Sequence, residues 1–166
     1  KADYHKAIEY GERLFKIGYE KQDYKFGILY AHIGLGQAYI MLGDSTAINH
    51  LGQAKLLAES EKNDSALCSI YNGMGLYASN IHRDYYSALH YFFEGIEATH
   101  RCQYQELEAI LLGNISSIYY LKDDPTGLTY SLQIYELGHQ LNSAYLIFIG
   151  ALNASYMYYL LHEYDK

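Results

Sequence analysis

The chain repeats itself about every forty residues, and this period constrains its fold more than any other feature. The small or apolar positions Ala7, Ala47, Ala88 and Leu128 are separated by 40, 41 and 40 residues. A fixed period in this range is typical of solenoids, in which each repeat packs against its neighbours. Because a solenoid offers a long surface to partners, the period favours a binding function over a catalytic one.

Helical periodicity and capping residues divide each period into two helices. Helices are expected at about 3–20, 24–42, 45–61, 65–81, 85–101, 104–122, 125–141 and 144–162. Cap signals occur at Gly43-Asp44-Ser45, which should end one helix and cap the next, at Asn63-Asp64-Ser65 and at Asp124-Pro125. With one proline in 166 residues, long helices joined by short turns fit the composition. The predicted fold is all-α, with about four helix-turn-helix repeats and eight antiparallel helices.

Charge and hydropathy exclude two classes of partner for this segment. The net charge is −7 and no basic stripe is present, which argues against direct nucleic-acid binding. The most apolar stretch, Tyr145–Tyr159, is interrupted by Gly150, Asn153 and Ser155, so no membrane span is expected. The chain has 21 tyrosines and no tryptophan, which predicts many half-buried rings with hydroxyls in water.

The two cysteines, Cys68 and Cys102, are expected near the same end of one helical pair but poorly aligned across it. We therefore expect free thiols, which favours a reducing compartment.

Both ends of the sequence fall inside a repeat, so we interpret it as one repeat domain, 1–166, within a longer protein. Complete repeats are expected at about 24–63, 64–103 and 104–142, with partial repeats at 1–23 and 143–166. No signal-like segment follows Lys1. A cytoplasmic location is expected, with the periplasmic sensor segment of a membrane-bound regulator as the alternative.

The segment Leu35–Asp44, Leu-Gly-Gln-Ala-Tyr-Ile-Met-Leu-Gly-Asp, resembles the first helix and turn of a tetratricopeptide (TPR) repeat. Ala47, Leu51 and Ala54 then follow the family's spacing of small and large residues in the second helix. Looser copies extend the resemblance over essentially the whole chain; they include Met74-Gly75 with Tyr77, Asn114 with Tyr119, and Asn153 with Tyr158 and Glu163-Tyr164. The repeat is longer than the family's usual unit.

The resemblance implies a right-handed α-α superhelix that binds a protein or peptide. Longer variants of this repeat occur in bacterial regulatory and signalling proteins, so it also implies the sensor or regulatory segment of a signalling or transcription-regulatory protein. A fold alone does not prove a function. An alternative is an oligomerisation or scaffold module that acts through its tyrosine-rich surface.

In such an array the first helix of each pair lines the concave face. Asn72, Asn114 and Asn153 are each followed five residues later by a tyrosine, and Gly34 with Tyr39 is the equivalent pair in the first complete repeat. An asparagine can both donate to and accept from a peptide backbone, and the resemblance implies that use here. The alternative is that each asparagine bonds a neighbouring helix.

The other candidates for contact with a partner on this face are polar, aromatic or methionine side chains. They are Gln37, Tyr30, Met41, Asn80, Ser117, Tyr120, Tyr156 and Tyr159. The tyrosines that follow the asparagines, Tyr77, Tyr119 and Tyr158, are expected in the core.

No catalytic or metal-binding pattern is evident. The eight histidines are scattered singly, and the closest group, His82 and His90 with Asp84, is interpreted as a solvated turn. His162-Glu163 begins like a zinc-protease motif but lacks its second histidine. We therefore expect no enzyme activity, no metal and no cofactor.

Overall fold

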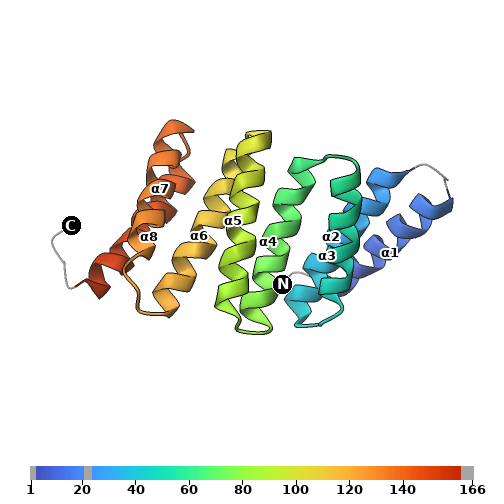
Figure 1. Ribbon diagram of the computed structural model, residues 1–166, viewed down its shortest axis with the longest axis horizontal. Helices are drawn as coiled ribbons and strands as arrows, with labels where there is room; N and C mark the ends of the chain where they lie inside the picture. Colours follow the sequence, from blue (N-terminus) through green and yellow to red (C-terminus); the bar gives the residue numbers. More distant parts are fainter. Residues whose placement is uncertain (1–2, 21–23, 162–166) are drawn as a thin grey trace. The chain divides into compact units, whose positions relative to one another are not determined.

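The computed structural model describes residues 3–20 and 24–161, and this part of the chain is helical, without a strand. The helices, shown in Figure 1, are α1 (Tyr4–Glu20), α2 (Lys25–Leu42), α3 (Ala47–Ser60), α4 (Asp64–Asn80), α5 (Tyr85–Cys102), α6 (Gln105–Leu121), α7 (Gly127–Gln140) and α8 (Ala144–Leu160). Every bound lies within two residues of the prediction, and the all-α repeat fold is confirmed. The predictions at His162, Glu163 and Tyr164 lie outside the described residues.

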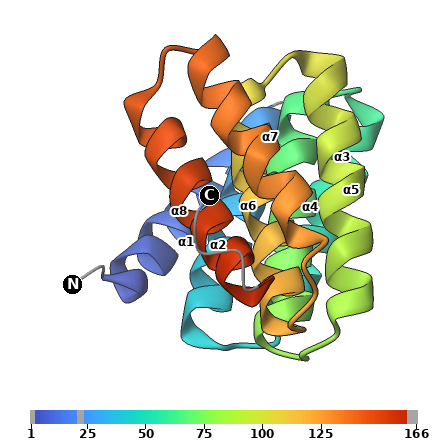
Figure 2. The ribbon, with the colours of Figure 1, turned by 90° about the vertical axis from the view of Figure 1, so that its left-hand side faces the viewer.

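The chain divides into two compact units, Lys1–Cys102 and Gln103–Lys166. In the first unit α2 packs against α1, α3 and α4, while α5 packs against α4. In the second unit α7 and α8 form a closely packed pair, visible in Figures 1 and 2, and α6 contacts both. Thus α2 and α4 are neighbours in one unit, and α6 and α8 are neighbours in the other.

The starts of α3 and α7 differ from the prediction in the same way. The Asp44 carboxylate accepts a hydrogen bond from the backbone N–H of Thr46 at 2.8 Å, and Asp124 accepts one from Thr126 at 2.9 Å. These bonds agree with the caps predicted at Gly43-Asp44-Ser45 and at Asp124-Pro125, and the capping side chains are those of Asp44 and Asp124. A turn of backbone bonds between residues three apart precedes each helix, which explains why both begin two residues late.

Aromatic packing repeats with a spacing of two repeats. Tyr39 stacks on His50 with ring centroids 5.5 Å apart, and Tyr119 stacks on Tyr130 at 5.6 Å. These rings are half-buried, as are those of Tyr77 and Tyr158, so the prediction that Tyr77, Tyr119 and Tyr158 lie in the core is wrong. The fully buried side chains are mostly aliphatic, because a tyrosine hydroxyl retains water more easily at the edge of a helix pair.

The two cysteines are well aligned, contrary to the prediction. Cys102 is the last residue of α5 and lies beside the first turns of α4, where its Sγ is 3.5 Å from the Sγ of Cys68. Helix α5 extends one residue beyond its predicted end, which brings the second thiol across the pair. Both thiols are free.

Glycines allow α7 and α8 to approach closely. A Cβ at Gly150 of α8 would lie 2.6 Å from the Cα of Tyr135, and one at Gly138 of α7 would lie 2.6 Å from the backbone nitrogen of Ile147. Backbone atoms cannot move aside as a side-chain tip can, so both contacts require glycine. Gly52 of α3 is different, because a Cβ there would meet no atom within 4 Å.

We predict opposite effects for Gly150→Ala and Gly52→Ala. The first should lower the free energy of unfolding by about 2 kcal/mol or more, because the added methyl group forces α7 from α8. The second should leave it unchanged or raise it by up to about 1 kcal/mol, because alanine favours the helix. Urea titrations followed by circular dichroism measure both. Equal effects of the two substitutions would contradict this account of α7–α8 packing.

A part-buried pair of histidines, His32 and His50, links α2 to α3. The Nδ1 atoms of His32 and His50 lie 3.0 Å apart, so one ring donates its proton and the other accepts it. The ring of Phe15 packs edge-on against His32. Burial, and then the neighbouring His50, lower the pKa of His32 to about 4, and burial also lowers the pKa of His50.

This pair should make folding sensitive to acid. The pKa of His32 falls from 6.5 to about 4 on folding, so between these values the unfolded chain binds protons that the folded chain does not. The contribution of His32 to the free energy of unfolding is therefore at its maximum above pH 6.5. It decreases by up to about 3 kcal/mol as the pH falls toward 4. Urea titrations at several pH values should show this slope in wild type, reduced in His32→Leu. The exposed His90→Gln serves as control and should keep the wild-type slope.

Candidate functional site

The inner helices are the first helices of the helical pairs, α2, α4, α6 and α8. Their starts show which of their residues are equivalent. The carbonyls of Tyr24, Asn63, Tyr104 and Ser143 each accept a hydrogen bond from the backbone N–H four residues later, at the starts of α2, α4, α6 and α8. The side chains of Asn63 and Ser143 also accept bonds from the third residue of their helices. These four caps therefore provide one common origin for counting along the inner helices.

Counted from the caps, the tenth residues are Gly34, Gly73, Asn114 and Asn153. Asn114 and Asn153 are therefore equivalent, as the sequence predicted. Asn72 is the ninth residue of α4, one position away from the register of the other two. The first unit thus carries glycine at both positions where the second unit carries asparagine.

A pocket of the first unit lies at Gly34 and Gly73. It has a volume of about 550 Å³, within the range of ligand sites, and lies between α1, α2 and α4. Its lining is Tyr4 and Ala7 from α1, Gly34, Gln37, Ala38, Ile40 and Met41 from α2, and Asn72, Gly73 and Leu76 from α4.

Gly34 accounts for much of this space. A Cβ at Gly34 would meet no atom within 4 Å, so close packing does not explain the glycine. The residues Gly34, Gln37, Ala38 and Met41 recur at the spacing of one helix face, and that face is directed into the pocket. At Gly73 a Cβ would lie 3.0 Å from the side chain of Leu51, so that glycine also serves packing against α3.

The pocket can bind an uncharged, mainly apolar group. None of its lining residues is Lys, Arg, Asp, Glu or His. The side chain of Met41 is 58% exposed at the pocket and can adapt its shape to a ligand. The amides of Gln37 and Asn72 are the polar groups best suited to orient a bound segment.

The second unit has two smaller pockets, lined in part by amides, hydroxyls and rings. Asn114, Ser117 and Asn153 line a pocket of about 240 Å³. Ser117 and Asn153, with Tyr120 and Tyr156, also line a pocket of about 170 Å³. The rings of Tyr120 and Tyr156 are 5.8 Å apart, and each side chain is about half exposed.

The side chains of Ser117 and Asn153 differ in the hydrogen bonds that they can form with a ligand. The Ser117 hydroxyl donates its proton to the carbonyl of Gly113 at 2.8 Å, so toward a ligand it can act as an acceptor. The half-buried Asn153 amide makes no hydrogen bond within the part of the chain that the structure describes. Asn153 can therefore both donate and accept.

Eight of the eleven predicted contact residues line one or another of these pockets, and three line none of them. Tyr30, Asn80 and Tyr159 are exposed but line none of the three pockets. Sequence reasoning missed Tyr4 and Ala7, because α1 was interpreted as the outer helix of a partial repeat. It also missed Gly73; glycine in the same register at Gly34 and Gly73 was the available signal.

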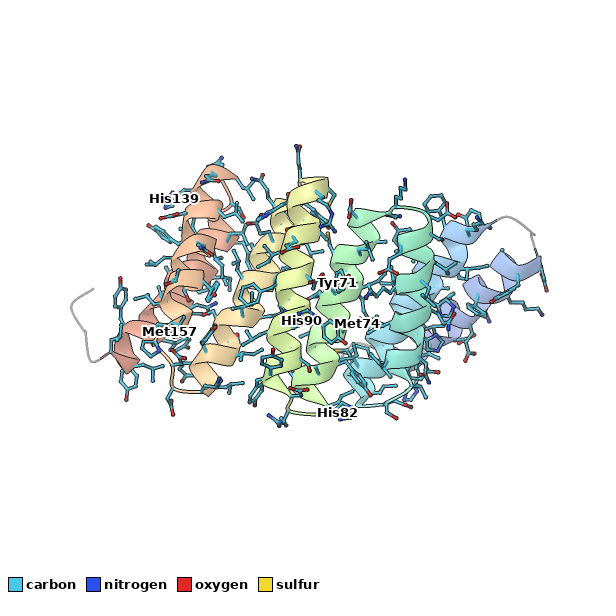
Figure 3. All side chains as sticks on the ribbon, in the orientation of Figure 1. Tyr71, Met74, His82, His90, His139 and Met157 are labelled. Carbon is cyan, nitrogen blue, oxygen red and sulfur yellow. The ribbon has the colours of Figure 1, made fainter. Side chains whose placement is uncertain are left out.

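The described histidines are spread over several helices and one turn, with His90 and His100 both on α5. Figure 3 shows His82 after α4, His90 on α5 and His139 on α7. Within residues 3–20 and 24–161, no three His, Cys, Asp or Glu side chains gather in a way that could hold a metal ion. In the same residues, no helix has both the length and the apolar character needed to cross a membrane.

The chain was compared with protein-family models, with curated proteins and with solved structures, and no match was found in any of the three comparisons.

Proposed function

We propose that the chain is a TPR-like binding module without catalytic function, which holds an extended protein segment against its inner helices. The observation that carries this proposal is the uncharged pocket of about 550 Å³ at Gly34 and Gly73. A large aliphatic or aromatic side chain of the partner would fill this pocket. Its burial supplies the main part of the affinity, because apolar area removed from water contributes about 25 cal/mol per Å².

The second unit would contact the partner through different chemistry. Asn153 offers a donor and an acceptor to a peptide backbone, and the Tyr120–Tyr156 pair offers flat apolar area beside it. These groups line one small pocket, which suits a short stretch of backbone with an apolar neighbour. Asn72 is out of register with Asn114 and Asn153, so the role proposed for it is in the first pocket only.

The biological setting is proposed on the resemblance at Leu35–Asp44. TPR-like repeats with lengthened helices support a sensor or regulatory segment of a bacterial signalling or transcription-regulatory protein. The partner would then be a protein or peptide rather than a nucleic acid, in keeping with the net charge of −7. A cytoplasmic location fits this role, and a periplasmic sensor segment is the alternative.

A large side chain placed in the first pocket should weaken the binding of peptides. A library of displayed twelve-residue peptides, selected on the wild-type protein, should yield binders that share a large uncharged apolar residue. Gly34→Leu should weaken these peptides at least about tenfold in calorimetric titration, because the leucine occupies the space of the anchor. Gly52→Leu, on an outer helix with equal room for a Cβ, should bind as wild type.

Circular dichroism must show that both leucine variants remain folded. Selection of no binder, or equal binding by Gly34→Leu and wild type, would contradict the proposed pocket.

Self-association is a second candidate function, favoured by an apolar stripe on α8. Tyr145, Phe148, Tyr156 and Tyr159 lie on one face of this helix and are 70%, 63%, 50% and 64% exposed. Contiguous exposed rings of this kind often mark an interface. Two copies of the stripe could pack against each other about a two-fold axis, burying the rings of both chains.

A charge in the stripe should then separate the copies. Sedimentation of the wild type across a concentration range should show a monomer–dimer equilibrium, and Phe148→Glu should raise its dissociation constant at least about tenfold. Tyr86→Glu, at a tyrosine 86% exposed on α5, is the matched control and should leave the equilibrium unchanged. A wild type that stays monomeric at every concentration would exclude this second function.

A further inference from the structure

One end of the α4–α5 pair holds two thiols in contact. The Sγ atoms of Cys68 and Cys102 are 3.5 Å apart, and a disulfide bond of about 2.0 Å needs only a small rotation of the side chains. Beside them, Arg101 of α5 donates from Nε to the Asp64 carboxylate of α4 at 2.8 Å. This exposed ion pair adds a further contact between the two helix ends that carry the thiols.

The two thiols differ in access. Cys68 is fully buried, and its thiol donates a hydrogen bond to the carbonyl of Asp64 at 3.0 Å. Cys102, at the end of α5, is only half-buried. Burial, followed by the hydrogen bond with Cys102, raises the pKa of Cys68 to about 12. Cys102 is therefore the thiol that meets a reagent from solution, and Cys68 is the one that reacts second.

We propose that Cys102 and Cys68 form a thiol modification site whose substrate is a low-molecular-weight disulfide of the glutathione type, with Cys102 as the attacking and Cys68 as the resolving cysteine. The thiolate of Cys102 attacks one sulfur of the small disulfide, a mixed disulfide forms, and one small thiolate leaves. Cys68 then loses its proton to the solvent and attacks the Cys102 sulfur. The internal disulfide forms and the second small thiolate departs.

The small disulfide is the oxidant in this reaction. Two protein thiols are oxidised to one disulfide, and one small disulfide is reduced to two small thiols. The second step is intramolecular, so the proximity of the sulfurs compensates for the weak acidity of Cys68. Modification of Cys102 also removes the hydrogen bond that helps to keep Cys68 protonated.

The disulfide would join the first turns of α4 covalently to the last residue of α5. Cys102 is the last residue of the first unit, and the chain turns directly after it through Gln103, whose φ is 56°. Oxidation therefore anchors to α4 the residue from which the second unit continues. By closing the loop between Cys68 and Cys102, the bond should raise the melting temperature of the protein by roughly 5 °C or more.

Mass spectrometry after equilibration with reduced and oxidised glutathione tests this proposal. Free thiols are alkylated before the intact mass is measured. Wild type in oxidised glutathione should lose two hydrogen atoms and accept no alkyl group. Cys68→Ser should accumulate one glutathione on Cys102, whereas Cys102→Ser should accumulate none within the same time.

Several results would overturn the proposal. They are wild type that stays fully alkylated at every glutathione ratio, wild type that retains glutathione without an internal bond, and a disulfide that joins two chains. Glutathione on Cys102→Ser at the rate seen for Cys68→Ser would overturn the assigned order. Circular dichroism checks that the variants fold, and the wild-type masses decide the central claim without them.

Discussion

Each of the turns between α2 and α8 reverses the chain through a single left-handed residue, and the register of the helices depends on it. These residues are Gly43, Lys62, Arg83, Gln103, Asp123 and Asn142. A residue other than glycine in this conformation costs about 1 kcal/mol. Hydrogen bonds that span the turns offset this cost: Asp44, Asn63, Asp124 and Ser143 each donate their backbone N–H to the carbonyl five residues earlier, at 2.9 Å. Because these turns are short and closed by hydrogen bonds, each helix starts at a defined residue, which fixes the counting along it.

Within this register, glycine has two opposite consequences. At Gly138 and Gly150 the missing side chain admits the backbone of the neighbouring helix, so α7 and α8 lie in close contact. At Gly34 no neighbour enters the space, and the missing side chain leaves a pocket instead. A glycine inside a helix costs about 1 kcal/mol relative to alanine. Close packing compensates for that cost at the first two positions but not at Gly34 or Gly52, and of these two only Gly34 lines one of the three pockets.

The sequence predicted all of the helices and most of their bounds, because periodicity and caps are local properties of the chain. It predicted caps at Gly43-Asp44-Ser45 and at Asn63-Asp64-Ser65. The side chains that accept the bonds are those of Asp44 and Asn63, and the backbone geometry selects them within each group. The pocket itself was not predictable, because its volume depends on how far α1 extends beside α2 and α4. The spacing between asparagine and tyrosine placed Asn72 in the wrong register, since it ignored the cap at Asn63.

Under the proposed binding function, the difference between Gly34 and Asn114, or between Gly73 and Asn153, changes the chemistry that equivalent helix positions offer to a partner. In the first unit the side chains are absent and the space of about 550 Å³ can accept a side chain of the partner. In the second unit the same positions carry amides, and the pocket that Asn114 and Asn153 line is smaller, about 240 Å³. A hydrogen bond exchanged with water contributes about 1 kcal/mol, whereas a buried large apolar side chain contributes about 2 kcal/mol or more. The first unit should therefore supply affinity, and the second should supply orientation and selectivity.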